Sequence, residues 1–352
     1  MKSRMFVTGV VAALSLLGVA WSAPSAAQQT TTLRVGNWLP NHHLIVRGII
    51  VPWARAIERE TNGTLKFDVM TSSIGRPPEF FDFVKNGVID VGYGVSGHNP
   101  GRFTMTQVMD LPFMSPDPWS GAAAAWATYQ RYGERYKEHA GVKIVGLWVH
   151  STPGIHMRGE PIRTIEDLKG KKIRVGGNVT GRIMAALGGT PVQLPPTEAQ
   201  QAMQSGVADG ITFPIESIEF FKITPVIKAT TEIPGGLYTD TFWLGINEAR
   251  WNSLTPEHKA AIEKHSGMAV AMNAGWAWTN GDEVGRAALR KNNVNFVTLP
   301  PAEVEKAKAA LKELEEEWLV EAKKRNLPGE EIIAYARAMV DVYRAEKRVN
   351  VP

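Results

Sequence analysis

The chain has 352 residues, of which 44% are hydrophobic and 21% are charged, so it has the composition and length of a globular protein with two domains. Its formal net charge of +4 comes from scattered lysines and arginines, which argues against a nucleic-acid-binding protein. It contains no cysteine, and its eight histidines show no recognised metal-binding spacing. We therefore expect no disulfide, no metal site and no cofactor.

The N-terminus has the features of a secretory signal peptide. Lys2 and Arg4 precede an apolar run, and small residues at 25–27 offer a cleavage site. The run is too short, and too closely followed by Pro24, to anchor the protein in a membrane. We expect residues 1–27 to be removed and the mature protein to be soluble and exported, without stable membrane insertion.

The first half of the mature chain alternates between strand and helix patterns. Alternation at this spacing is typical of βαβ units and predicts a largely parallel sheet. The strand VKIVGLWVH is apolar almost throughout, as expected of a strand that is buried on both faces. Strands are expected at 33–38, 65–70, 88–93 and 142–150, and helices at 42–61, 78–86 and 119–139.

A second series of strands and helices begins at Thr164, and the strand expected at 239–247 returns the chain to the first domain. Thr255 is a good helix N-cap, and the helical pattern after it is long enough for about 50 Å. One helix across both domains and two stacked helices broken near Gly281 are both open alternatives. Two charged amphipathic helices are expected at 301–324 and 329–348.

Arg174 is the residue most indicative of function. It lies between β-branched residues near the end of an expected strand, KKIRV, where an unpaired guanidinium is expensive to bury. Ligands bind at this end of the strands in open α/β sheets, and a guanidinium offers a planar donor fork that fits a carboxylate. The alternatives are a solvated strand face or an ion pair between Arg174 and an internal acid.

The stretch around Arg174 resembles the signature of the periplasmic substrate-binding proteins of TRAP transporters, the DctP-like family. The resemblance extends from about Thr32 to the C-terminus, and it implies that Arg174 grips the carboxylate of a ligand. A second arginine of the family falls on Arg158. The family pattern LKGxKxRV, LGxxPV, a Glu-led helix and a GxxDG turn corresponds here to residues 168–175, 187–192, 198–205 and 206–210.

The resemblance implies an α/β, two-domain periplasmic binding protein fold with mixed, mostly parallel sheets, flanking helices and a long helix that spans both domains. The hinge would include crossings near 150–158 and 239–247, in addition to the long helix. Domain I would comprise residues 28–153 and about 244–280, and domain II residues 154–243 and about 281–352.

The resemblance also implies a function. The ligand would be a small organic anion, enclosed by hinge closure and delivered to the membrane permease subunits of a sodium-driven TRAP transporter. We expect a monomer that binds no nucleic acid. An ABC-type receptor is the rival among binding proteins. A secreted hydrolase is the rival of another class, but the sequence lacks the GxSxG, SxxK and P-loop motifs, and we expect no enzyme.

Further candidate ligand-binding residues lie where expected strands end. Trp38 and His98 also have structural alternatives, in core packing and in a surface loop. Gly177 occupies a position where some relatives carry a ligand-binding asparagine, which makes Asn178 a candidate substitute. The set comprises Trp38, Tyr93, Ser96, His98 and Asn178, and the strand expected at 239–247 adds Phe242 and Trp243.

Phe213 is the clearest departure from the better-known family members, which often have asparagine three residues after the glycine that corresponds to Gly210. An aromatic ring removes a group that reads hydroxyls and adds apolar wall. With Phe242 and Trp243, it predicts a carboxylate with an apolar or aromatic body, unless Phe213 turns into the core. The Glu-Trp pattern of metal-assisted oxo-acid binders is also missing at this turn, so no bound sodium or calcium is expected.

Overall fold

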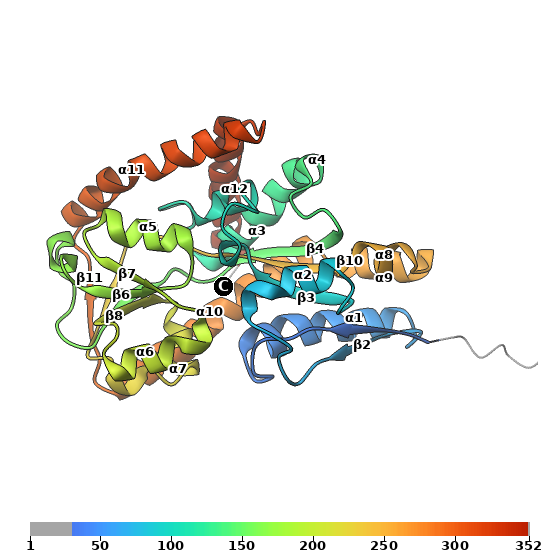
Figure 1. The fold of residues 1–352 in the computed structure, drawn as a ribbon, viewed down its shortest axis with the longest axis horizontal. Helices are drawn as coiled ribbons and strands as arrows, with labels where there is room; N and C mark the ends of the chain where they lie inside the picture. The colour runs from blue at the N-terminus through green and yellow to red at the C-terminus, as the bar shows by residue number, and fades with distance from the viewer. Residues whose placement is uncertain (1–29, 351–352) are drawn as a thin grey trace, which may run out of the picture.

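The computed structural model describes residues 30–350, so the expected signal peptide lies outside the described residues. Two β-sheets with flanking helices form two lobes, and helix α10 (Met268–Lys291) passes between them (Figure 1). The described part of the chain therefore has the expected α/β architecture with mixed, mostly parallel sheets. Within it, no helix is long and apolar enough to cross a membrane.

The first lobe is built on a five-stranded sheet. Its only antiparallel member among the described strands is β10, which pairs with both β3 and β4. Val95, at the end of β3, pairs with Phe242, and Val149, at the end of β4, pairs with Thr241. The start of β10 therefore lies at the carboxyl ends of its neighbours. The order is β2 (Leu65–Val69), β1 (Thr31–Val35), β3 (Val91–Val95), β10 (Thr241–Asn247), β4 (Val142–Val149).

The second lobe is built on a six-stranded sheet in which β5 is the strand that runs against its neighbours β8 and β9. Gly154, the first residue of β5, pairs with Phe213, the last residue of β8. The order is β11 (Asn295–Thr298), β9 (Ala229–Glu232), β5 (Gly154–Met157), β8 (Gly210–Phe213), β6 (Lys172–Val175), β7 (Thr190–Gln193).

Helices cover both sheets, and some are shorter than the sequence predicts. The helix expected at 119–139 ends as α3 at Thr128, continues as a π-helical turn and closes with one further turn, α4. Those of the first lobe are α1 (Val51–Glu60), α2 (Phe80–Lys85), α3 (Pro118–Thr128), α4 (Glu134–Tyr136), α8 (Glu248–Asn252) and α9 (Pro256–His265); those of the second lobe are α5 (Asn178–Ala186), α6 (Ala199–Ser205), α7 (Ile215–Phe220) and α11 (Pro301–Lys324).

The long helical pattern after Thr255 forms two helices, α9 and α10, and α10 is the one that contacts both lobes. The break lies at Ser266–Gly267, between α9 and α10, and not near Gly281. Gly267 has φ +65°, and a Cβ there would lie 2.7 Å from the ring of Trp126, so glycine suits this corner. From Met268 the helix continues for 24 residues, about 36 Å, and contacts α3 of the first lobe and α7 of the second.

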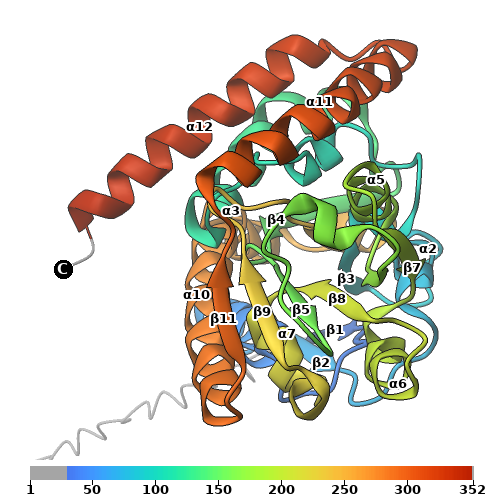
Figure 2. The same cartoon turned by 90° about the vertical axis from the view of Figure 1, so that its left-hand side faces the viewer.

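The C-terminal helix belongs to the first lobe, and not to the second as the expected domain boundary implies. The resemblance implies that residues from about 281 to 352 belong to the second domain, but α12 (Gly329–Asn350) packs on α3, and Ile332, Ile333 and Ala336 belong to the core of the first lobe. Figure 2 shows α11 rising from β11 and α12 leaving it at an angle at the other end. The chain thus returns to the first lobe after α11 because the apolar face of α12 is buried there.

Candidate ligand-binding site

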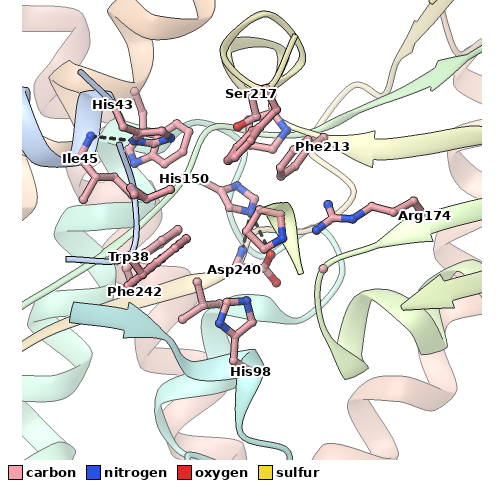
Figure 3. A pocket seen from close by; sticks show the side chains of 17 residues that line it. Trp38, His43, Ile45, His98, His150, Arg174, Phe213, Ser217, Asp240 and Phe242 are labelled. Atoms are coloured by element: carbon pink, nitrogen blue, oxygen red, sulfur yellow. Dashed lines mark hydrogen bonds and ion pairs between the residues drawn. The ribbon is translucent and has the colours of Figure 1, made fainter. Parts of the chain in front are cut away.

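A small cavity of about 40 Å³ lies between the lobes, at the carboxyl ends of β3, β4, β6 and β8. Trp38, His98 and Phe242 line it from the first lobe, whereas Arg174 and Phe213 line it from the second (Figure 3). The cavity is therefore composed of both lobes, and its volume depends on how they are placed relative to each other.

Arg174 is the charged donor of the cavity. Its side chain is 1% exposed; Nε and Nη2 donate to the carbonyl of Leu194 at 3.1 and 2.7 Å, and Nη1 has no hydrogen-bond partner among the described residues. Burial lowers the pKa of Arg174 to about 10, more than nearby anions raise it, so the guanidinium stays charged at neutral pH. A buried cation with a free donor is suited to an anionic ligand.

Aromatic rings form most of the remaining wall. Phe213 lies under the guanidinium, with Cζ of Arg174 4.5 Å from its ring centroid, and it stacks on Phe221 at 5.6 Å. On the opposite side Phe242 stacks on Trp148, with centroids 5.5 Å apart and planes within 5°. Phe213 thus faces the cavity, and the space in front of Arg174 fits a flat apolar body.

Asp240 and His150 form a polar pair at the same place. The backbone N–H of Asp240 donates to Nε2 of His150 at 3.0 Å, and Nδ1 of His150 lies 2.7 Å from the carbonyl of Ser151. Since a carbonyl only accepts, Nδ1 carries the proton. Burial raises the pKa of Asp240, but the neighbouring groups, among them the charged guanidinium of Arg174, outweigh this and lower the pKa overall. Asp240 is therefore a carboxylate inside the cavity.

The pKa values of two neighbouring groups are shifted toward their neutral forms. Burial, together with the charge of Asp240, raises the pKa of Asp110 well above its usual value, although Thr241 donates to its Oδ1 from both N and Oγ1. Burial also lowers the pKa of His98 to about 4, more than Asp240 raises it. The described charges of the cavity are thus Arg174 and Asp240, which are opposite in sign.

The structure brings together five of the sequence-predicted residues: Trp38, His98, Arg174, Phe213 and Phe242 all line the cavity. The other candidates do not line it. Tyr93 is in the core, where its hydroxyl donates to Asn37 at 2.5 Å, and Trp243 points to the opposite face of β10 from Phe242, onto Phe81. Ser96 is buried beside the cavity, and Asn178 begins α5.

Arg158 does not line the cavity, so the expectation that it binds the ligand or supports Arg174 is wrong. It is exposed and follows the last residue of β5, where its backbone N–H bonds to the carbonyl of Asp209. Because β5 is antiparallel, the start of this strand faces the cavity and its end lies at the far edge of the sheet. Arg158 therefore has no contact with Arg174 or with the cavity.

Sequence reasoning missed several lining residues, among them His43, His150, Asp240 and Trp278. His150 directly follows β4 and Asp240 directly precedes β10, so recognising β10 as antiparallel would have placed both at the ligand edge. Trp278 lies on α10 and His43 just before the first helix, where periodicity alone indicates core packing.

Behind the cavity, buried Glu216 of α7 lies beside half-buried Asp282 of α10 and His43 of the first lobe. Burial raises the pKa of Glu216 to about 8 and that of Asp282 to about 6, and the Glu216 backbone N–H donates to Asp282 Oδ1 at 3.1 Å. His43 Nε2 lies 3.8 Å from Glu216 Oε1, but burial lowers the pKa of His43 to about 3. This pair is therefore a contact between neutral groups at pH 7, and not a salt bridge. No group of three or more metal-ligating side chains occurs between residues 30 and 350.

Comparison with known proteins gives consistent matches. A family model described as "Bacterial extracellular solute-binding protein, family 7" matches residues 35–321. A Comamonas testosteroni protein described as "Outer membrane transporter protein TsaT" is 26% identical over 352 residues, which cover 99% of each chain. These matches include both lobes and the residues of the cavity.

Solved structures agree with the fold. A TRAP periplasmic solute-binding protein from Bordetella bronchiseptica with bound (R)- and (S)-mandelate is 32% identical, covers 88% of this chain and 99% of its own, and superposes with a TM-score of 0.85. A TRAP protein from Rhodoferax ferrireducens with copurified benzoate is 25% identical (90% and 99% covered, TM-score 0.85). A marine metagenome TRAP protein specific for aromatic acids, with 3-hydroxybenzoate, is 28% identical (90% and 99%, TM-score 0.84).

Proposed function

Since this chain belongs to the family 7 bacterial extracellular solute-binding proteins, we propose that it binds a small aromatic or similarly apolar monocarboxylate for a TRAP transporter. The observation that carries this proposal is Arg174, a fully buried cation whose Nη1 lacks a partner among the described residues, in a cavity walled by Phe213, Phe242 and Trp38. The benzoate and hydroxybenzoate complexes of similar proteins support the same ligand class.

The mechanism that we propose is hinge closure. The cavity of about 40 Å³ is smaller than the ~150 Å³ that accommodates a benzene ring. An aryl acid would therefore enter while the lobes are apart, and they would close on it by bending at the crossings near 150–158 and 239–247 and along α10. The carboxylate then meets Arg174 from the second lobe while the ring meets Trp38 and Phe242 from the first.

The cellular role follows from the family. The mature protein would act as a monomer in the periplasm and hand its ligand to the permease subunits of a sodium-driven transporter. The alternative of an ABC-type receptor is disfavoured by α10, which contacts both lobes as the TRAP-type fold requires. We propose binding without turnover, because the family and its solved members are described as solute-binding proteins.

A thermal-shift panel tests the ligand class. We expect benzoate, mandelate and similar aryl acids to raise the melting temperature, and sialic, gluconic and galacturonic acids to leave it unchanged. Sugar hydroxyls would face the apolar wall, where each unpaired hydroxyl costs about 1–3 kcal/mol. Stabilisation by a sugar acid alone would contradict the proposed ligand class.

The variant Phe213→Asn provides the matched test of the wall. It removes a ring that lies 4.5 Å from the guanidinium carbon of Arg174, an arrangement worth about 0.5–2 kcal/mol. We expect the Kd for benzoate to rise about 3- to 30-fold, with no loss of folding by circular dichroism. Lys222→Ala, a change at an exposed position just beyond α7, is the control and should bind benzoate as the wild type does. An unchanged Kd for benzoate in Phe213→Asn would show that Phe213 is not part of the binding site.

A further inference from the structure

Asp240 is a second charge in the cavity, and its role is not explained by the binding of a carboxylate. Among the described residues its carboxylate oxygens have only long hydrogen-bond contacts, with Thr180 Oγ1 at 3.4 Å and His150 Nε2 at 3.3 Å. His150 Nε2 accepts from the backbone N–H of Asp240 at 3.0 Å while Nδ1 faces the Ser151 carbonyl, so in this arrangement Nε2 donates no hydrogen bond to the Asp240 carboxylate. Asp240 therefore keeps strong acceptor capacity beside the place where an anionic ligand binds.

Asp240 and the guanidinium of Arg174 both lie close to Gly176. A Cβ on Gly176 would lie 3.5 Å from Asp240 Oδ2 and 3.8 Å from Arg174 Nη2, so both groups border the same small space (Figure 3). A ligand carboxylate on Arg174 would then be close to the Asp240 carboxylate. Two anions in a buried space repel each other unless a hydrogen-bond donor lies between them.

We propose that Asp240 is a specificity-determining residue that accepts a hydrogen bond from a hydroxyl on the carbon next to the ligand's carboxylate. The preferred ligands are then 2-hydroxy acids with an aryl body, of which mandelate is the simplest. This inference rests on the proposed function and narrows its ligand class. The hydroxyl supplies the proton that separates the two carboxylates, and no charge has to change.

On the side of the cavity opposite Arg174, we expect a ligand hydroxyl to weaken binding. Opposite Arg174, the wall is formed by Trp38, Ile45 and Phe242. A hydroxyl at the far end of the ligand ring would point at these apolar groups and lose its hydrogen bonds to water. The position of the hydroxyl on the ligand, and not only its presence, is therefore decisive.

Titration calorimetry with three matched ligands tests the inference: phenylacetate, mandelate and 4-hydroxyphenylacetate. With the wild-type protein we expect mandelate to bind at least about 10-fold more tightly than phenylacetate, and 4-hydroxyphenylacetate more weakly than either. In Asp240→Ala the ratio between mandelate and phenylacetate should fall to about 2-fold or less, and phenylacetate should bind more tightly because the repulsion is gone. Asp240→Asn keeps a carbonyl acceptor of the same size and should retain a preference for mandelate.

The outcomes separate this inference from the proposed function. Equal Kd values of the wild-type protein for phenylacetate and mandelate would overturn the role of Asp240 and leave aryl-acid binding intact. A mandelate preference that persists in Asp240→Ala would also overturn it. If none of the three acids binds, both proposals fail. Should Asp240→Ala not fold, the wild-type ratio and the Asp240→Asn ratio still decide.

Discussion

Replacing Arg174 by alanine should weaken the binding of an aryl carboxylate on the order of 30-fold to several thousand-fold. The side chain is buried, and its Nη1 is the free charged donor of the described cavity. Removing one member of a buried charge pair costs roughly 2–5 kcal/mol, because the other charge is left unpaired. Titration calorimetry with benzoate would measure the change.

Two further variants test whether the loss of affinity is specific to the guanidinium of Arg174. Arg174→Lys keeps the charge but loses the planar fork, so we expect an intermediate affinity. Arg158→Ala removes an exposed arginine at the far edge of the same sheet and should bind as the wild type does. Wild-type affinity in Arg174→Ala would discard the assignment of this residue, and a strong effect of Arg158→Ala would contradict the position that the structure gives it.

Replacing Glu216 by glutamine should make the protein more stable at alkaline pH. The pKa of Glu216 is raised by burial from 4.5 to about 8, although Ser217 Oγ donates to its Oε2 at 2.8 Å. A carboxyl with a raised folded-state pKa binds more protons folded than unfolded, so the free energy of unfolding falls as pH rises from about 4.5 to about 8 and is level above that. The loss is on the order of 3–5 kcal/mol.

The pH profile distinguishes this effect from simple repacking. Glu216→Gln should match the wild type near pH 4.5 and exceed it at pH 9, as measured by denaturant unfolding at both pH values. At this site the remaining pH dependence would come from Asp282, whose pKa is raised to about 6 by burial, while His43 stays neutral and Arg47 is the nearby cation. Glu219→Gln, an exposed change on the same helix, is the control; an equal gain at both pH values would contradict the prediction.

The sequence was a good guide to the architecture because strand and helix patterns alternate and the signature motifs keep their order. It also indicated that Arg174 and Phe213 lie near each other, since the ends of the parallel strands β6 and β8 meet at one edge of a sheet. What it did not contain was strand direction. Both β5 and β10 run against their neighbours, which moves Arg158 away from the cavity and brings Asp240 into it.

Finer features depend on packing that no local pattern records. Phe242 and Trp243 are adjacent and similar, yet alternation along β10 sends one to the cavity and the other to the core. The long helix pattern did not show whether the break falls at Gly267 or Gly281, because glycine is tolerated in helices; in the structure Gly267 takes φ +65° and Gly281 lies inside α10. The apolar face of α12 is likewise evident from sequence, but its partner α3 is not.

The return of α12 to the first lobe determines how the protein can be divided into fragments. Neither lobe is a continuous piece of chain: the first is assembled from residues around 30–149, 241–280 and 329–350, and the second from the segments between them. A gene fragment cut at one point would therefore encode incomplete cores. Conversely, a protease that nicks the loop at 325–328 leaves α12 held on α3 by buried side chains, so the cleaved protein should elute from a sizing column as one particle and separate only in denaturant.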